Sequence, residues 1–360
     1  MSSPSRLPHI DALKALAAQV IVLHHLVSYG PIADAAHEAL PTLAGALHEY
    51  GRMAVQVFLV VGGFLSARAL SPQGGLLQAP LPQLLWRRYL RLVLPFLAAL
   101  ALTLGACLLA APSWPELVPA DISAGQLLAH VLLLHDVLGF EALTVGAWYV
   151  AIDLQLFACL AGLLWLARRA GRPVAGPLLV AALALASAFA LNRDTALDAW
   201  APYFFAAYGL GALVQWLGLL QHRRAGLALL GLLALAFGAS LALDWRDRLA
   251  LALATALWLA WAEARQAQGR PLLPARWAPA LSAWARPSYA LFLLHVPVLL
   301  LANTLLANLD DAGVAMGLLL LVVAWALANW LSPPFHRWVE VPAARVDPLT
   351  WRWRLSSRTV

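Results

Sequence analysis

Charged residues are scarce in this chain of 360 residues: Asp, Glu, Lys and Arg make up 12% of it, while hydrophobic residues make up 62%. A soluble domain carries about twice that share of charge, and a soluble fold of this length could not bury so much apolar surface around one core. Cysteine is also scarce. Cys107 and Cys159 lie in apolar runs, without a disulfide framework or metal-ligand spacing. These shortages exclude a conventional cytosolic enzyme, a disordered scaffold and a disulfide-rich secreted module, and they leave a polytopic membrane protein.

The hydrophobic residues form segments long enough to cross a membrane, which takes about 20 apolar residues in a helix. We expect an all-α fold with about ten transmembrane helices, at residues 12–29, 53–70, 92–111, 144–167, 174–191, 200–219, 225–243, 247–264, 287–307 and 312–332. The first segment carries Lys14 and lacks a small-residue cleavage pattern, so we expect it to remain as a span rather than leave as a signal peptide. The run 127–138 is too short to span and predicts an interfacial or re-entrant piece.

The charged residues alternate between successive loops. One set of connections, together with both termini, holds nineteen of the 24 Lys and Arg and only three acids. The opposite loops hold thirteen of the 18 Asp and Glu and only three arginines. Cytoplasmic loops are the ones enriched in Lys and Arg, so we expect both termini in the cytoplasm of a multi-pass inner-membrane protein. The net charge of +6 then reflects orientation in the membrane rather than nucleic-acid binding.

Ionisable residues inside the predicted spans are candidates for function. Lys14 and His25 are eleven residues apart, about three helical turns, so they share one face, with His25 about 16 Å further into the membrane. His24 points elsewhere. The span 144–167 runs inward from the outer side and carries Asp153 at a similar depth, where a carboxylate would stabilise a charged imidazole. The alternatives are an Asp11–Lys14 anchor at the inner interface and a structural His–Asp pair that locks two helices.

Three further features have both a functional and a structural interpretation. His295 lies near mid-membrane, where a single imidazole is commonly satisfied by a neighbouring helix. Arg88 and Arg91 are three residues apart on one helix face, a pattern that suits a phosphate but also serves as ordinary positive-inside anchoring. Gly62-Gly63 would allow a helix or a ligand to approach closely, and small residues are also the usual packing seam between spans.

In their order along the chain, these pieces resemble the acyltransferase 3 family of integral membrane acyltransferases, from Asp11 to Pro342. The motifs that carry the resemblance are Lys14 with His25, Phe58 to Leu65, Arg88-Tyr-Leu-Arg91 with Pro95, Trp148 through Asp153 to Phe157, Ser288-Tyr289 through His295 to Pro297, and Glu340-Val-Pro342. The chain departs from the family pattern in having Lys14 where Arg is commoner, Gly62 for Ser, Asp153 for Glu and Phe157 for Tyr. The resemblance implies an acyltransferase 3-like transmembrane domain over residues 1–345, followed by a basic cytoplasmic tail, 346–360.

The resemblance also implies an activity, which is transfer of an acyl group, usually acetyl, from cytoplasmic acyl-CoA to a hydroxyl of a glycan or lipid-linked sugar. His25 would be the catalytic base for the acceptor hydroxyl, with Asp153 orienting it or stabilising its imidazolium. A covalent acyl-His intermediate, with Asp153 activating the acceptor, remains open. The phosphates of CoA would bind Lys14, Arg88 and Arg91. The predicted substrate channel is lined by Trp148, Tyr289 and His295.

No metal cofactor is expected, since the histidines show no ligand spacing. The outer stretch 112–146, with His130, His135 and Asp136, is where we expect acceptor specificity, and polysaccharide-assembly proteins are possible partners. Two other classes of function stay open. A transporter or flippase could relay protons through His25, Asp153 and His295, although no matched halves or paired broken helices are present. A structural subunit of a polysaccharide secretion complex would tolerate the loss of His25.

Overall fold

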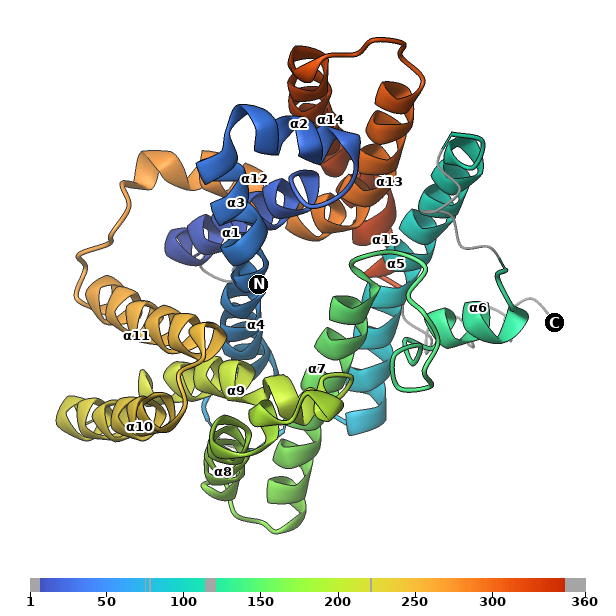
Figure 1. The fold of residues 1–360 in the computed structure, drawn as a ribbon. Coiled ribbons are helices and arrows are strands. Elements are labelled where there is room, and N and C mark those ends of the chain that lie inside the picture. Colours follow the sequence, from blue (N-terminus) through green and yellow to red (C-terminus); the bar gives the residue numbers. More distant parts are fainter. Residues whose placement is uncertain (1–6, 75, 78, 114–120, 221, 347–360) are drawn as a thin grey trace.

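The computed structural model describes residues 7–74, 76–77, 79–113, 121–220 and 222–346, and within these ranges the chain is helical without strands, as expected (Figure 1). Of the predicted basic tail 346–360, all but the first residue lies outside the described residues. The longer helices are α1 (Pro8–Leu26), α4 (Ala54–Leu70), α5 (Leu81–Ala110), α7 (Ala147–Arg169), α8 (Ala175–Phe189), α9 (Ala201–Leu217), α10 (Arg223–Leu243), α11 (Asp247–Ala267), α13 (Ser288–Ala307) and α14 (Val314–Phe335).

Shorter helical elements connect the long helices. They are α2 (Pro31–Ala39), α3 (Pro41–Tyr50), η1 (Gly51–Met53), α6 (Ala124–Val131), η3 (Leu191–Arg193), η4 (Thr195–Leu197), η5 (Ala275–Trp277), α12 (Ala278–Ala285), the π-helical turn η6 (His336–Glu340) and α15 (Val341–Ala343). Proline stands in the first turn of α1, α2, α3 and α12, where its missing N–H costs no intrahelical bond. The predicted non-spanning run 127–138 forms α6 and the turns after it.

Each of the ten predicted spans coincides with a long helix, but the count of ten is not confirmed. In the described part of the chain, seven helical segments are long and apolar enough to cross a membrane: 41–70, 81–110, 147–169, 175–193, 223–243, 288–307 and 314–343. The pair α1 and α2, bent by 100° at its break, adds an eighth if it forms one span. The predicted spans at α9, which has 17 residues, and at α11 fall outside this set. The molecule is therefore a multi-pass membrane protein, and its full number of crossings stays a prediction.

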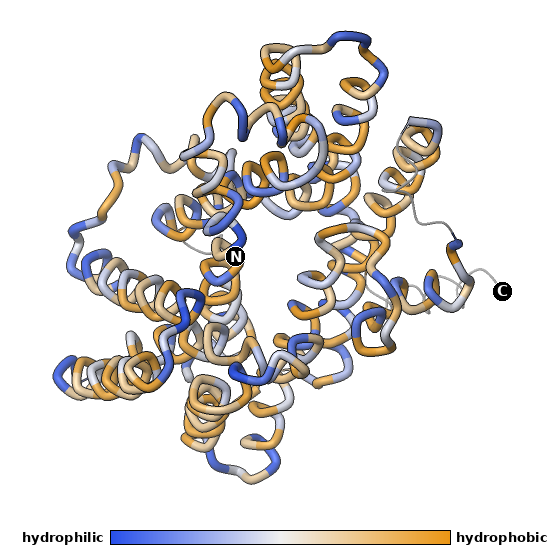
Figure 2. Tube along the Cα trace, viewed as in Figure 1, coloured by the Kyte–Doolittle hydropathy of each residue, from blue (hydrophilic) through white to orange (hydrophobic). Residues whose placement is uncertain are grey.

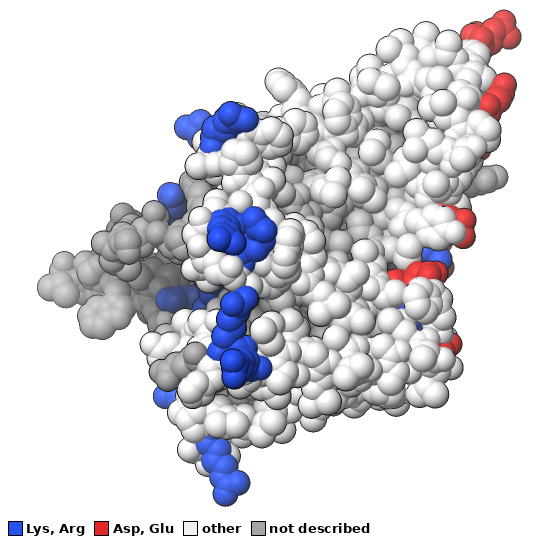
Figure 3. All heavy atoms as spheres, turned by 90° about the vertical axis from the view of Figure 1, so that its left-hand side faces the viewer, with Lys and Arg blue, Asp and Glu red and all other residues white. Residues whose placement is uncertain are grey.

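Charge is sorted to two opposite ends of the molecule. Figure 3 shows most of the visible Lys and Arg on one side and the Asp and Glu on the other, where a small basic group also lies, with uncharged surface between the two sides. We call the end formed by the α4–α5, α7–α8, α9–α10 and α11–α12 connections the basic face, and the opposite end the acidic face. A hydrogen bond from Arg168 to the Leu77 carbonyl joins the last turn of α7 to the α4–α5 connection at the basic face. This separation agrees with the loop alternation in the sequence, and the placement of the basic face in the cytoplasm remains a prediction.

Hydrophobic residues cover the helices, and hydrophilic residues gather at helix ends and connections (Figure 2). The peripheral helices α10 and α14 expose large apolar side chains, such as Leu235 (73% exposed) and Trp330 (71%), as lipid-facing helices do. By contrast, α9 is buried along almost its whole length. Apolar exposure on the outside and burial at α9 place the core between α4, α7, α8, α9 and α11.

Glycine allows two of these core helices to touch backbone to backbone. A Cβ on Gly63 of α4 would lie 1.8 Å from the Tyr208 carbonyl oxygen, and one on Gly211 of α9 would lie 1.9 Å from the Val60 carbonyl oxygen. The Tyr208 hydroxyl also donates a buried hydrogen bond to Ser66 Oγ at 2.7 Å. The two glycines singled out in the sequence thus lie in a packing seam between α4 and α9. Gly62 faces the Tyr208 ring, and Gly63 faces the Tyr208 backbone.

Candidate active site

The structure brings His25 and His295 together in the interior. His25 lies in the last turn of α1 and His295 in the second turn of α13, and their side chains are joined by a hydrogen bond of 2.7 Å between His25 Nδ1 and His295 Nε2. The ring centroids are 4.8 Å apart and the planes differ by 5°. So short a nitrogen–nitrogen distance in near-parallel rings places them edge to edge in one plane rather than face to face. His25 is 9% exposed and His295 is 1% exposed.

The neighbours of His295 decide which nitrogen carries each proton. His295 Nδ1 lies 3.3 Å from the Leu291 carbonyl oxygen, which can only accept, so this nitrogen is the donor. In a neutral imidazole the other nitrogen is then an acceptor, and His295 Nε2 must receive its hydrogen bond from His25 Nδ1–H. His25 is left with a lone pair on Nε2. The arrangement therefore presents a neutral imidazole whose basic nitrogen faces away from its partner.

His25 Nε2 remains available to a substrate. It has no hydrogen-bond partner among the described residues. The fully buried side-chain atoms of these residues that lack a partner are Arg88 Nε, both ring nitrogens of His135 and Glu340 Oε1, and His25 Nε2 is not one of them. His25 Nε2 is therefore not fully enclosed by protein atoms, although the residue as a whole is buried. The adjacent His24 is engaged differently, with Nδ1 donating to the Leu47 carbonyl at 3.0 Å. Both histidines thus keep an Nε2 lone pair, and His25 differs in having the imidazole of His295 bonded to its Nδ1, an arrangement that suits a general base.

Asp153 does not contact His25, which corrects the expected His25–Asp153 pair. Its carboxylate instead accepts from Arg88 NH2 at 2.5 Å, and the Arg88 guanidinium lies 5.2 Å from the centroid of the Phe157 ring. Asp153 is 7% exposed. The physical reason is lateral position: α7 packs against α5, which carries Arg88, whereas His25 on α1 faces α13. A guanidinium is the stronger and more permanent partner for a buried carboxylate, because it stays charged at all relevant pH.

Aromatic side chains lie between the Arg88–Asp153 pair and the histidines. Tyr149 is one helical turn before Asp153, and its ring lies 5.3 Å from that of Phe292, which in turn lies 5.9 Å from the His295 ring. The predicted channel residue Trp148 contacts Phe204 at 5.8 Å between centroids. These ring contacts join α7, α9 and α13. Phe292 and Tyr149 were not singled out in the sequence, since apolar aromatics in a span carry no distinguishing signal.

The other predicted anion-binding residues gather around Glu340. Lys14, the only lysine in the chain, lies within electrostatic reach of Asp11, Arg91 and Glu340, and Arg91 within reach of Arg88 and Glu340. Glu340 pairs with His336 at 2.8 Å. The structure thus brings Lys14 and Arg91 together with an acid that offsets part of their charge, while Arg88 is committed to Asp153. Binding of CoA phosphates by these three residues remains a prediction.

Tyr289, which was predicted to line the channel, donates a hydrogen bond to the Leu92 carbonyl at 2.8 Å. This bond ties α13 to α5 one residue after the Arg-x-x-Arg segment. Its hydroxyl is therefore occupied, and the side chain is half-buried.

Two histidines of the outer stretch stack on each other. The His130 and His135 rings lie 4.2 Å apart, and both side chains are fully buried. His130 Nδ1 donates to the Gln126 carbonyl and its Nε2 accepts from the Leu143 N–H, so His130 is held neutral. Burial, and then the neighbouring His130, lowers the pKa of His135 from 6.5 to about 4. These contacts stabilise the segment between α6 and α7, and the described residues hold no group of three metal-ligating side chains there or elsewhere.

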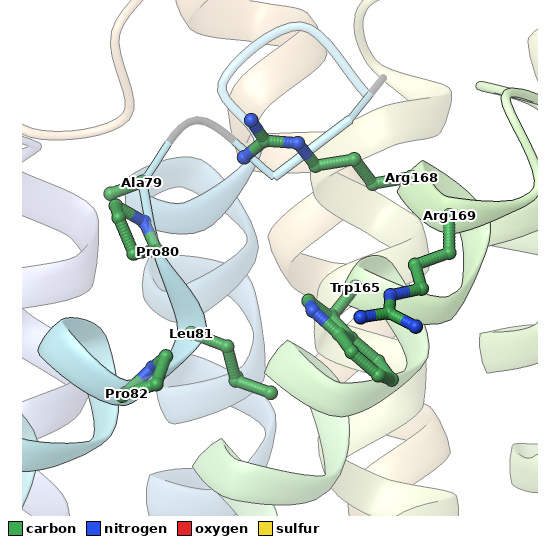
Figure 4. A pocket seen from close by; sticks show the side chains of 7 residues that line it. All are labelled: Ala79, Pro80, Leu81, Pro82, Trp165, Arg168 and Arg169. Carbon is green, nitrogen blue, oxygen red and sulfur yellow. The ribbon is translucent and has the colours of Figure 1, made fainter.

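The structure also contains a cavity at the basic face that no sequence pattern predicted. It is lined by Trp165, Arg168 and Arg169 together with the turn that begins α5 (Figure 4). The Arg169 guanidinium lies 4.6 Å from the Trp165 ring centroid. The signal available in the sequence was a Trp followed four residues later by Arg, which places both on one helix face. The same arginines also fit the general positive charge of this loop, so the pattern does not single out a cavity.

Comparison with protein families gives one match: the model of the acyltransferase domain family, Acyl_transf_3, matches residues 7–331. This range covers all residues of the histidine pair and of the Arg88–Asp153 pair. No curated protein and no solved structure matches the chain.

Proposed function

Because the chain belongs to the acyltransferase 3 family and is a multi-pass membrane protein, we propose that it transfers an acyl group, acetyl in the simplest case, from acyl-CoA to a hydroxyl of a glycan or lipid-linked sugar. The observation that carries this proposal is the hydrogen bond that His25 Nδ1–H donates to His295 Nε2, because this bond leaves His25 Nε2 as an accessible base. The basic face would lie on the cytoplasmic side of an inner membrane, the side on which acyl-CoA is found.

In the proposed reaction, His25 Nε2 takes the proton of the acceptor hydroxyl as its oxygen attacks the thioester carbonyl. The C–S bond of the tetrahedral intermediate then breaks, and the imidazolium returns the proton to the departing CoA thiolate. His295 acts as a positioning residue. It holds the His25 ring in one orientation, and its Nε2 lone pair lies against the His25 Nδ1–H that becomes part of the imidazolium. The surrounding apolar side chains strengthen this interaction because they lower the local dielectric.

Asp153 takes a different part in this proposal from the one its spacing suggested. With its carboxylate bound to Arg88, it neutralises a guanidinium inside the protein and fixes α5 against α7. The covalent alternative, in which Asp153 activates the acceptor after acylation of His25, would require that pair to open. Direct transfer needs no such rearrangement, and the geometry favours it.

The competing function is a transporter with a proton relay through His25, His295 and Asp153. The His25–His295 hydrogen bond would suit such a relay, but within the described residues Asp153 bonds to Arg88 and contacts neither histidine. Dependence on CoA separates the two functions, since a transporter moves its substrate without it.

The test uses purified protein in lipid, supplied with acetyl-CoA and a hydroxyl acceptor such as a lipid-linked oligosaccharide. Release of free CoA thiol is followed for wild type, His25→Ala and His24→Gln. The last is the matched control, because the His24 side chain bonds to a backbone carbonyl of α3 and not to His295. We expect turnover in wild type and control, and a loss of at least about 100-fold for His25→Ala, as for removal of a general base. Turnover that survives His25→Ala would contradict the proposed role of His25 as the base. Failure of well-folded wild type to bind acetyl-CoA would favour the transporter.

A further inference from the structure

A cavity of about 400 Å³ lies at the basic face, between the start of α5 and the end of α7. It is lined by Ala79, Pro80, Leu81, Pro82, Trp165, Arg168 and Arg169. In Figure 4 the proline-rich turn stands on one side, and Trp165 with the two arginines stands on the other. The volume falls within the range of pockets that enclose small organic ligands, and the two prolines limit the flexibility of one wall.

The residues that line this cavity suit an anionic ligand with a flat ring. Arg168 and Arg169 bring two positive charges, and none of the described lining residues is acidic. Arg168 uses one N–H on the Leu77 carbonyl at 3.0 Å, which holds the side chain while other donors of its guanidinium remain. Arg169 is held over the Trp165 ring at 4.6 Å. Guanidinium groups bind phosphates bidentately, and an indole edge and face give a surface against which a purine can stack.

The cavity lies on the same pair of helices as the Arg88–Asp153 pair. Along α5, Arg88 is seven residues past Leu81, about 10 Å deeper and on nearly the same helix face. Along α7, Asp153 is twelve residues before Trp165, about 18 Å deeper. The cavity is thus the basic-face end of the α5–α7 seam. Since Arg88 is already paired with Asp153, the guanidinium groups that remain to bind phosphate are those of Arg168 and Arg169, at the basic-face end of the seam.

We infer that this cavity binds the adenosine 3′,5′-bisphosphate portion of the acyl-CoA donor, with Arg168 and Arg169 on its phosphates and Trp165 beside its adenine. This inference rests on the proposed function, because it takes acyl-CoA as the donor. The nucleotide would stay at the basic face, and the pantetheine arm would carry the thioester inward along the seam. The phosphate of a lipid headgroup has the same charge chemistry and is the competing source, since Trp and Arg also gather at membrane interfaces.

The test compares acetyl-CoA with S-acetylpantetheine, which lacks the adenosine 3′,5′-bisphosphate and the phosphate next to it, on wild type and on Arg168→Gln/Arg169→Gln. We expect the double substitution to raise KM for acetyl-CoA by about 10- to 100-fold, as for the loss of charge-assisted hydrogen bonds to phosphate, with kcat changed less than about twofold. The kcat/KM for S-acetylpantetheine should equal that of wild type, which also shows that the variant is folded. Arg172→Gln is the matched control, because Arg172 is exposed in the same turn and does not line the cavity.

The same measurements are made in nanodiscs of phosphatidylcholine alone and of phosphatidylcholine with phosphatidylglycerol. The inference requires the KM effect in both. An effect present only with the anionic lipid would assign the cavity to a headgroup and overturn the inference. An unchanged KM for acetyl-CoA in an active double variant would also overturn it, while leaving the proposed function intact. A wild type that uses neither donor would instead show that the proposed function itself had failed.

Discussion

Removal of one partner of the Arg88–Asp153 pair should destabilise the protein strongly. The two side chains meet at 2.5 Å, and their side-chain exposure is 20% for Arg88 and 9% for Asp153. Truncation of one member of a buried ion pair leaves an uncompensated charge and typically costs 3–5 kcal/mol. Because Arg88 keeps a fifth of its side chain exposed, we expect about 3 kcal/mol for Asp153→Asn or Arg88→Met. The double variant Arg88→Met/Asp153→Asn should lose about 1 kcal/mol or less, since no unpaired charge remains.

The assay is equilibrium unfolding in mixed micelles of a mild detergent with increasing SDS, followed by the fluorescence of the 16 tryptophans. The quantity is the coupling free energy of the double-mutant cycle, expected at about 5 kcal/mol, because each single variant loses about 3 kcal/mol and the double variant about 1 kcal/mol or less. Catalytic activity is measured on the same preparations. An Asp153→Asn protein with wild-type stability but no turnover would refute the structural role and restore Asp153 as a direct partner in the chemistry.

Three further predictions follow from single contacts. Gly63→Ala should cost about 3 kcal/mol of unfolding free energy or prevent folding, because the new Cβ would meet the backbone of α9. Gly62→Ala should cost about 1 kcal/mol or less, because its Cβ would meet only the edge of the Tyr208 ring at 3.3 Å. Comparable losses for the two variants in SDS unfolding would contradict the α4–α9 packing seam. His135 has a pKa of about 4 in the folded protein and 6.5 in the unfolded chain, so the segment between α6 and α7 should lose stability as pH falls from 6.5 to 4, with no further loss below pH 4. Hydrogen exchange of this segment measures the loss. A His135→Phe variant with the same pH dependence would contradict the prediction. Tyr289→Phe removes the hydrogen bond to the Leu92 carbonyl and should cost about 1 kcal/mol in the same unfolding assay, and no loss would show that the bond forms only weakly.

The helices could be predicted from the sequence because apolar length and loop charge are local properties. Every predicted span coincides with a helix, and the charged loops lie at two opposite ends. The number of crossings was harder to predict, since α9 is short although buried along almost its whole length, and the break after α1 turns the chain by 100°. The run of residues 12–29 carries no signal for that bend beyond Gly30-Pro31 directly after it, where Gly30 takes a positive φ of 79°.

The candidate site could be predicted only in part. Residue counting placed His25 and Asp153 at similar depths, but depth does not reveal which helices are neighbours. The pairing of His25 with His295, and of Asp153 with Arg88, depends on the lateral arrangement of α1, α5, α7 and α13. The proton positions depend on one backbone carbonyl, that of Leu291, which no residue pattern announces. The cavity at Trp165 was hidden for another reason, because its arginines also satisfy the ordinary charge bias of a membrane loop.

The most direct test of acyl transfer at His25 is a single-turnover measurement with acetyl-CoA labelled on the acetyl group, mixed with excess protein in lipid and a glycan acceptor and quenched in acid. We predict label on the acceptor hydroxyl within one turnover for wild type, no stable label on the protein, and no label on the acceptor for His25→Ala. Label that reaches the acceptor equally fast in the His25→Ala protein would contradict the account.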